Sequence, residues 1–115
     1  MKYTTSKIGS ITLIEFAKRL TSDEDLDAFK RAVREMLGAG RRQFIFDVRQ
    51  TLHVDSSGLA TLIEVWSEIK RQHGTLVLAV SPSSKMDEVL NTTKLKSLFS
   101  VSDNLDDAKT RIGTQ

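Results

Sequence analysis

The chain has 115 residues, of which 39% are hydrophobic and 28% are charged, and its formal net charge at pH 7 is +2. This length and composition predict one soluble domain, residues 1–115, with a single hydrophobic core. The absence of cysteine excludes disulfide bonds and thiolate metal sites. No apolar run approaches the roughly 18 residues of a membrane span, and the N-terminus lacks a signal peptide. We therefore expect a cytoplasmic protein with no membrane attachment.

Two strands are predicted first, at residues 3–8 and 10–16, with the turn signal Gly9-Ser10 between them. This short connection predicts an antiparallel hairpin. Apolar residues fall on both alternating faces of the second strand, so we expect that strand to lie inside the sheet.

A helix with an acidic first turn is predicted next. Residues 21–25 offer several N-cap side chains, and acidic groups are favoured at the positive end of a helix. Apolar residues then recur at helical spacing until Gly38-Ala39-Gly40 ends the helix. These apolar residues are Leu26, Phe29, Val33, Met36 and Leu37.

The stretch from residue 43 to residue 63 joins a strand to a helix through a polar turn. Phe44–Val48 is the predicted strand, and the helix is expected from about Ser57 to His73. In between, Asp55-Ser56-Ser57-Gly58 offers N-cap oxygens and a glycine that either a second backbone or a partner could approach closely. The turn is either a plain strand-to-helix connection or a partner site, because such sites concentrate at the carboxyl ends of strands.

The second helix carries an apolar stripe that we expect to face the sheet. Trp66 is assigned to the core, with exposure at an interface as the alternative. The stripe consists of Leu59, Leu62, Ile63, Trp66 and Ile69.

Strands and helices continue to alternate to the C-terminus. Residues 75–80 are almost wholly apolar, as expected for a strand covered on both faces. A helix is predicted at about Pro82–Thr92 with Ser81 as its N-cap, then a short strand within Leu95–Val101, then a helix capped by Asp103-Asn104. The order β-β-α-β-α-β-α-β-α predicts an α/β fold with a mixed, mostly parallel sheet flanked by helices.

A serine hydrolase is the enzymatic alternative, because His53 and Asp55 flank the approach to Ser56. The nucleophile-elbow pattern is missing, since Val54 stands where it needs glycine. Nothing in an extended segment aims His53 or Asp55 at Ser56. His73 is interpreted as a solvent-exposed group near a helix end. We therefore predict that the protein is not an enzyme.

The sequence offers no pattern for a cofactor, a metal ion or nucleic acid. Gly38-Ala39-Gly40 precedes a strand rather than a helix, which is the wrong order for a dinucleotide-binding loop. No spacing of His, Asp and Glu indicates a metal site. Arg31, Arg34, Arg41 and Arg42 are locally basic, but we interpret them as a solvated helix end rather than a nucleic-acid surface.

The central motif resembles a known family. Phe46-Asp47-Val48, followed by the run from Val54 to Leu59, is similar to the signature of STAS domains, the sulphate-transporter and anti-sigma-factor-antagonist family. The resemblance continues through Val80-Ser81-Pro82, residues 89–95 and Leu98-Phe99, in the same order and spacing. The family fold, a mixed sheet flanked by helices, agrees with the predicted element order.

The resemblance implies an anti-sigma factor antagonist that regulates transcription by partner switching. Such proteins bind a serine-kinase anti-sigma factor and so release the sigma factor. The kinase phosphorylates the serine after the motif aspartate, here Ser56, and a metal-dependent serine phosphatase reverses this. Asp55, Ser56, Ser57 and Gly58 are the implied partner-binding residues. The implied protein is a binding module without a cofactor, and we expect a monomer when it is free.

Some alternatives stay open at this stage. The family often has Gly-x-Leu-Asp after the second strand, but here Ala17–Ser22 contains no Gly and no Asp after Leu20. Lys94 stands where a glycine often follows the third helix. Asp55 is either a cap or a group that positions Ser56 for the kinase, and Ser56 is taken as the N-cap. The alternative function is a structural subunit of a stressosome or lipid-transport assembly.

Overall fold

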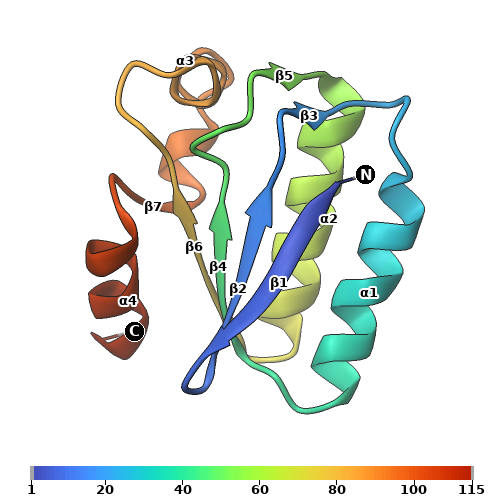
Figure 1. Cartoon of the computed structure of the whole chain (residues 1–115), viewed down its shortest axis with the longest axis vertical. Coiled ribbons are helices and arrows are strands. Elements are labelled where there is room, and N and C mark those ends of the chain that lie inside the picture. Colours follow the sequence, from blue (N-terminus) through green and yellow to red (C-terminus); the bar gives the residue numbers. More distant parts are fainter. Residues whose placement is uncertain (1, 115) are drawn as a thin grey trace.

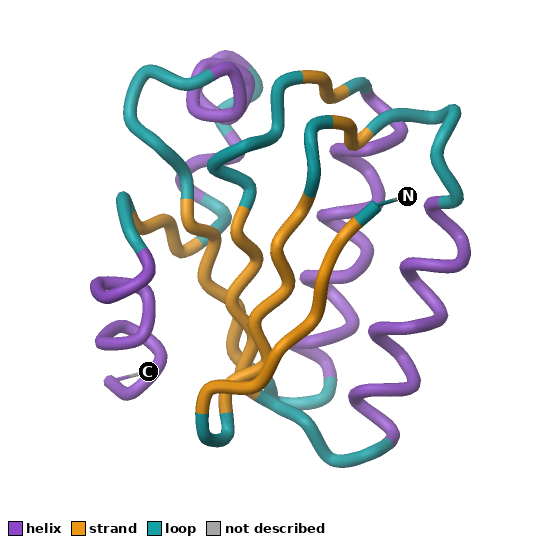
Figure 2. The backbone as a smooth tube through the Cα atoms, viewed as in Figure 1, coloured by secondary structure: helices purple, strands orange, loops and turns teal. Residues whose placement is uncertain are grey.

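The structure is a computed structural model that describes residues 2–114, and strands and helices alternate along it (Figures 1 and 2). The strands are β1 (Tyr3–Ile8), β2 (Ile11–Phe16), β3 (Arg19–Leu20), β4 (Gln43–Asp47), β5 (His53–Val54), β6 (Thr75–Ala79) and β7 (Ser100–Ser102). The helices are α1 (Leu26–Gly38), α2 (Ser56–Arg71), α3 (Lys85–Thr92) and α4 (Leu105–Thr114), with a short 3-10 helix, η1 (Leu95–Ser97).

The main sheet has the strand order β1-β2-β4-β6-β7. β1 and β2 form the predicted antiparallel hairpin, and every other neighbouring pair is parallel. The prediction of a mixed, mostly parallel sheet with β2 in its interior is therefore confirmed. α1 and α2 cover one face and α4 the other (Figure 1). Within the described residues, no helix is long and apolar enough to cross a membrane.

Alternate side chains of each inner strand serve two separate cores. On β4, Phe44 and Phe46 pack on the face covered by α1 and α2, whereas Ile45 joins Ala108 and Ile112 of α4. β6 alternates in the same way, which confirms that it is covered on both faces. The period-two alternation of a strand thus explains why these strands are apolar at nearly every position.

Helix α3 begins later than predicted. We expected Ser81 to cap a helix that starts at Pro82, but α3 starts at Lys85 and its N-cap is Ser84. The Ser84 hydroxyl accepts the backbone N–H of Asp87 at 3.2 Å. The Asp87 carboxylate accepts the backbone N–H of Ser83, just before the cap, at 3.0 Å. A serine and an acidic residue three positions apart therefore fix the helix start here rather than at the proline.

The predicted strand within Leu95–Val101 is divided between η1 and the shorter strand β7. Between α3 and η1, Lys94 adopts a left-handed conformation with φ +61°. Glycine favours this conformation because it has no Cβ, which explains why a glycine is common here in the resembled family. At the other end of β7, the Asn104 side chain accepts the Asp107 N–H at 2.8 Å, so the predicted cap of α4 is confirmed.

The inward face of α2 differs in part from the predicted stripe. Leu62 and Ile69 are buried as predicted, whereas the other three residues of the stripe are only partly buried against the same core. Val65, which we did not predict, is also buried. The buried face of α2 therefore follows positions 58, 62, 65 and 69, and it is rotated slightly about the helix axis from the face that was predicted from the sequence.

Leu62→Ala should lower the free energy of unfolding by about 2 to 5 kcal/mol, because Leu62 is completely buried and its loss leaves a cavity. Leu52→Ala is the matched control. Leu52 is 51% exposed, so its loss should change stability by less than about 0.5 kcal/mol. Urea denaturation of both variants measures the difference. Equal midpoints for the two variants would contradict the assigned helix face.

Candidate functional site

A second, two-stranded sheet lies beyond the carboxyl ends of β2 and β4, next to the start of α2 (Figure 1). It pairs β3 with β5 in parallel, and neither strand was predicted from the sequence. The backbone N–H groups of Leu52 and His53 both donate to the Lys18 carbonyl, at 2.8 and 3.0 Å. The segment that leads into α2 is therefore held against the segment that follows β2.

A partly buried ion pair fixes the connection between β4 and β5. Arg49 donates from Nε and Nη2 to the two carboxylate oxygens of Asp47, each at 2.9 Å. Asp47 is the last residue of β4 and is buried. Such a two-pronged contact restrains orientation as well as distance. The chain therefore leaves β4 along a defined path towards the predicted site.

Asp55, and not Ser56, is the N-cap of α2. The prediction placed the cap at Ser56 and the helix start near Ser57, but the helix begins at Ser56. One oxygen of Asp55 accepts the Gly58 N–H at 2.9 Å, and the other accepts the Ser22 N–H at 2.8 Å. A carboxylate can accept both bonds at once, and this makes Asp55 the better cap at a helix start that must also hold a second segment. These two bonds are called the Asp55 bridge below.

The Asp55 bridge also sets the charge of the site. The backbone N–H groups of Ser22 and then Gly58 hold the pKa of Asp55 below its ordinary value of 3.8, because they stabilise the ionised carboxylate. Asp55 therefore carries a negative charge throughout the neutral pH range.

Gly58 is required by the fold. A Cβ at this position would lie 1.9 Å from the carbonyl oxygen of Leu20, and Gly58 is itself buried. Of the two explanations left open by the sequence, a second backbone is therefore what approaches this glycine. The close contact lets α2 pack directly on β3.

Ser56 and Ser57 are the exposed members of the predicted set, whereas Asp55 is half-buried and Gly58 is buried. Within the described residues, the Ser56 hydroxyl makes no hydrogen bond to another residue. The carbonyl of Ser57 accepts the Thr61 hydroxyl at 3.0 Å, as often happens inside helices. The turn thus presents a free hydroxyl on a scaffold that its neighbours hold in place.

The residues considered for a hydrolase do not form a catalytic triad. His53 is exposed, and no hydrogen bond within residues 2–114 joins it to Asp55 or Ser56. The Asp55 carboxylate is engaged by two backbone groups instead of a histidine. The described part of the chain also holds no group of three or more His, Asp or Glu side chains placed to bind a metal ion.

Comparison with known proteins identifies the family. The family model described as the STAS domain matches residues 4–108. The chain belongs to the STAS domain family. Its fold is shared with solved structures of low sequence identity, while no curated protein sequence matches it. The sequence resemblance to STAS domains is thereby confirmed.

The similar structures are those of anti-sigma factor antagonists. A candidate antagonist from Thermotoga maritima is 21% identical, with a TM-score of 0.85, and the match covers 96% of this chain and 93% of that one. The antagonist SpoIIAA in its unphosphorylated form is 14% identical, with a TM-score of 0.71 and 96% of each chain covered. Phosphorylated SpoIIAA of Bacillus is 16% identical, with a TM-score of 0.73, and the match covers 96% of this chain and 99% of that one.

Gly58→Ala should lower the free energy of unfolding by about 1 to 3 kcal/mol, because its methyl group would collide with the Leu20 backbone. Gly38→Ala, at the end of α1, is the matched control. A Cβ there meets nothing within 4 Å, and alanine favours helix, so stability should stay constant or rise by up to about 1 kcal/mol. Chemical denaturation tests both variants, and a neutral Gly58→Ala would contradict the close packing of α2 on β3.

Asp55→Asn should lower the free energy of unfolding at pH 7, and the difference from the wild type should become smaller as the pH falls. Because the folded-state pKa of Asp55 is lowered, its charge stabilises the fold above the unfolded value of about 3.8, and this contribution disappears as pH falls through the folded value. Asparagine can still cap the helix, but its single carbonyl oxygen accepts only one of the two N–H groups, so the substitution removes the charge together with one bond of the Asp55 bridge. Urea midpoints of wild type and variant, measured from pH 7 to pH 2.5, should converge. A difference that stays constant across this range would show that the Asp55 charge does not stabilise the site.

Proposed function

We propose that the protein is an anti-sigma factor antagonist that binds a serine-kinase anti-sigma factor and is switched off by phosphorylation of Ser56. The observation that carries the proposal is the exposed Ser56 hydroxyl at the first residue of α2, which the fold does not use because Asp55 caps the helix. The fold is that of SpoIIAA, which also exists in a phosphorylated form. In this role the protein regulates transcription in the cytoplasm by partner switching.

Phosphorylation of Ser56 would change the charge of the surface without breaking a bond of the fold. A phosphate adds ~1.5 to 2 negative charges, and the free N–H groups and dipole of a helix N-terminus stabilise it. The Asp55 carboxylate opposes a second negative charge, but two backbone donors already stabilise that carboxylate. Both forms of SpoIIAA align with this chain at nearly equal TM-scores, 0.71 and 0.73, which supports a switch that preserves the architecture.

The proposed partner surface is the turn from Asp55 to Gly58. Ser56 and Ser57 offer exposed hydroxyls, while Asp55 and Gly58 act by holding the turn in place. Leu52 is 51% exposed shortly before this turn and adds an apolar contact for the kinase. A phosphate at Ser56 would place negative charge in the centre of this surface and release the partner. A metal-dependent serine phosphatase would restore the binding form.

In this account the protein is a substrate and a binding module rather than an enzyme. ATP belongs to the kinase, and the antagonist itself holds no nucleotide or metal ion. The free protein is a monomer. A structural subunit of a larger assembly would instead form a stable oligomer and would not depend on modification of Ser56.

Incubation with ATP and an anti-sigma kinase should add one phosphate to the wild type and to Ser57→Ala, and none to Ser56→Ala. Intact-mass measurement and peptide mapping detect the modification. Ser56→Ala should also keep its stability within about 0.5 kcal/mol of wild type, because Asp55 provides the cap. Ser56→Asp should bind the kinase more weakly than wild type in titration calorimetry, since it brings negative charge to the contact surface.

The outcomes separate the two functions. If only Ser57 is phosphorylated, the switch exists but its phosphorylated residue is Ser57 and not Ser56. If Ser56→Asp and the phosphorylated protein both bind the kinase as tightly as the wild type, the switch does not exist. Stable oligomers in sedimentation velocity, together with no phosphorylation by any kinase tested, would favour the structural subunit.

A further inference from the structure

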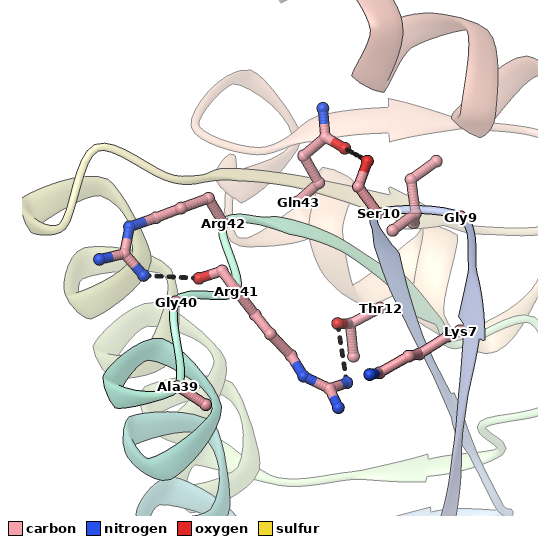
Figure 3. A pocket seen from close by; sticks show the side chains of 10 residues that line it. Lys7, Gly9, Ser10, Thr12, Ala39, Gly40, Arg41, Arg42 and Gln43 are labelled. Carbon is pink, nitrogen blue, oxygen red and sulfur yellow. Dashed lines mark hydrogen bonds between the residues drawn. The ribbon is translucent and has the colours of Figure 1, made fainter.

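A pocket of about 560 Å³ opens at the end of the sheet opposite Ser56. Its walls are the β1–β2 hairpin and the connection from α1 to β4, so it lies at the amino ends of the parallel strands (Figures 1 and 3). The site described above lies beyond the carboxyl ends of the same strands. The two places are therefore separated by the length of the sheet.

The charge of this pocket is entirely positive. Lys7, Arg41 and Arg42 line it, and no Asp or Glu does. Elsewhere the basic side chains commonly have carboxylate partners, such as Glu64 for Lys30 and Asp107 for Arg111. Within residues 2–114, neither Lys7 nor Arg41 forms an ion pair.

The side chains of Lys7 and Arg41 meet beside Thr12. Lys7 pairs directly with Thr12 across the β1–β2 hairpin, so the side chains of these two residues stand on the same face. Arg41 donates to the Thr12 hydroxyl at 3.2 Å, which brings its guanidinium to the same position. Figure 3 shows the Lys7 ammonium reaching towards the Arg41 guanidinium. Two cations that face each other repel, and an anion placed between them would turn this repulsion into attraction.

Arg42 differs from Lys7 and Arg41 because its guanidinium binds the backbone. Its guanidinium donates to the carbonyls of Leu37 and Arg41, at 2.8 and 2.7 Å. The Leu37 carbonyl lies in the last turn of α1, where a positive charge is favourable, and the Arg41 carbonyl lies in the connection after it. Arg42 contributes to the positive potential of the pocket, while Lys7 and Arg41 keep donors that can reach a ligand.

Two glycines, Gly9 and Gly40, line the pocket. Gly9 and Gly40 both have positive φ angles, +60° and +93°, and a Cβ on either would meet nothing within 4 Å. The volume lies within the range of about 300 to 1,000 Å³ that small-molecule sites occupy. No aromatic side chain lines the pocket to stack on a ring. The recognised part of a ligand is therefore its anionic group.

We propose that this pocket binds the phosphate group of a small anionic solute between the Lys7 ammonium and the Arg41 guanidinium. Arg41 can offer two parallel N–H donors to phosphate oxygens while keeping its bond to Thr12, and Lys7 adds a mobile positive charge. The inference does not rest on the proposed function, because it uses none of the residues at the start of α2.

Titration with sodium pyrophosphate at constant ionic strength tests the site. Amide NMR signals of Gly9, Gly40 and Arg41 should shift and saturate, and the thermal midpoint should rise with ligand concentration. Lys7→Gln and Arg41→Gln should each weaken binding by about tenfold or more, as expected for the loss of a charge-assisted bond. Lys85→Gln, which removes an exposed positive charge on α3, should bind like the wild type, and so should Ser56→Asp.

Lys7→Gln keeps the test valid if Arg41→Gln disturbs the fold, because the exposed Lys7 side chain makes no hydrogen bond within residues 2–114. Shifts that grow without saturation, or equal affinities for Lys7→Gln and Lys85→Gln, would overturn the proposal. Titration with a hexaglutamate peptide tests the alternative occupant, an acidic protein segment. If this peptide binds through Lys7 and Arg41 while pyrophosphate does not, the occupant is an acidic protein segment and the proposal fails.

Discussion

The bridge made by the Asp55 carboxylate is the interaction on which the geometry of the site depends. One oxygen closes the first turn of α2 through Gly58, and the other holds Ser22, which follows β3. Gly58 in turn lets the Leu20 backbone pack against the helix. Because residues 20–22 and 55–58 hold each other through these contacts, the start of α2 is kept in place without help from Ser56. The exposed hydroxyl is thus free to carry a signal.

The order of the four helices and of the strands of the main sheet, and the family, could be predicted from the sequence because they rest on local patterns. Strands such as β4 and β6 show continuous apolar runs, and α2 shows helical spacing. The Asp-Ser-Ser-Gly turn also marked the place of the proposed site. What the pattern could not decide was which of two adjacent capping residues is used, because Asp55 and Ser56 have similar intrinsic preferences and only the position of Ser22 distinguishes them.

The parts that were missed depend on contacts between distant segments. β3 and β5 are too short to show alternation, and the amide of Ser22 has no sequence signature because every residue except proline carries one. Arg41 was interpreted as part of a solvated helix end, but the hairpin register places Lys7 and Thr12 beside it. One signal was present, since Leu20 is an isolated leucine in a polar stretch and proves to be completely buried.

Amide hydrogen exchange at Ser22 and Gly58, compared between the unmodified protein and protein carrying phosphoserine at position 56, tests the central claim most directly. These two amides report the Asp55 bridge itself. If the fold holds the site independently of Ser56, their exchange rates and the helical signals of the first turn of α2 should be unchanged, while the surface charge differs. Loss of protection at both amides on phosphorylation would contradict the account, because the phosphate would then act by displacing Asp55 from its bridge.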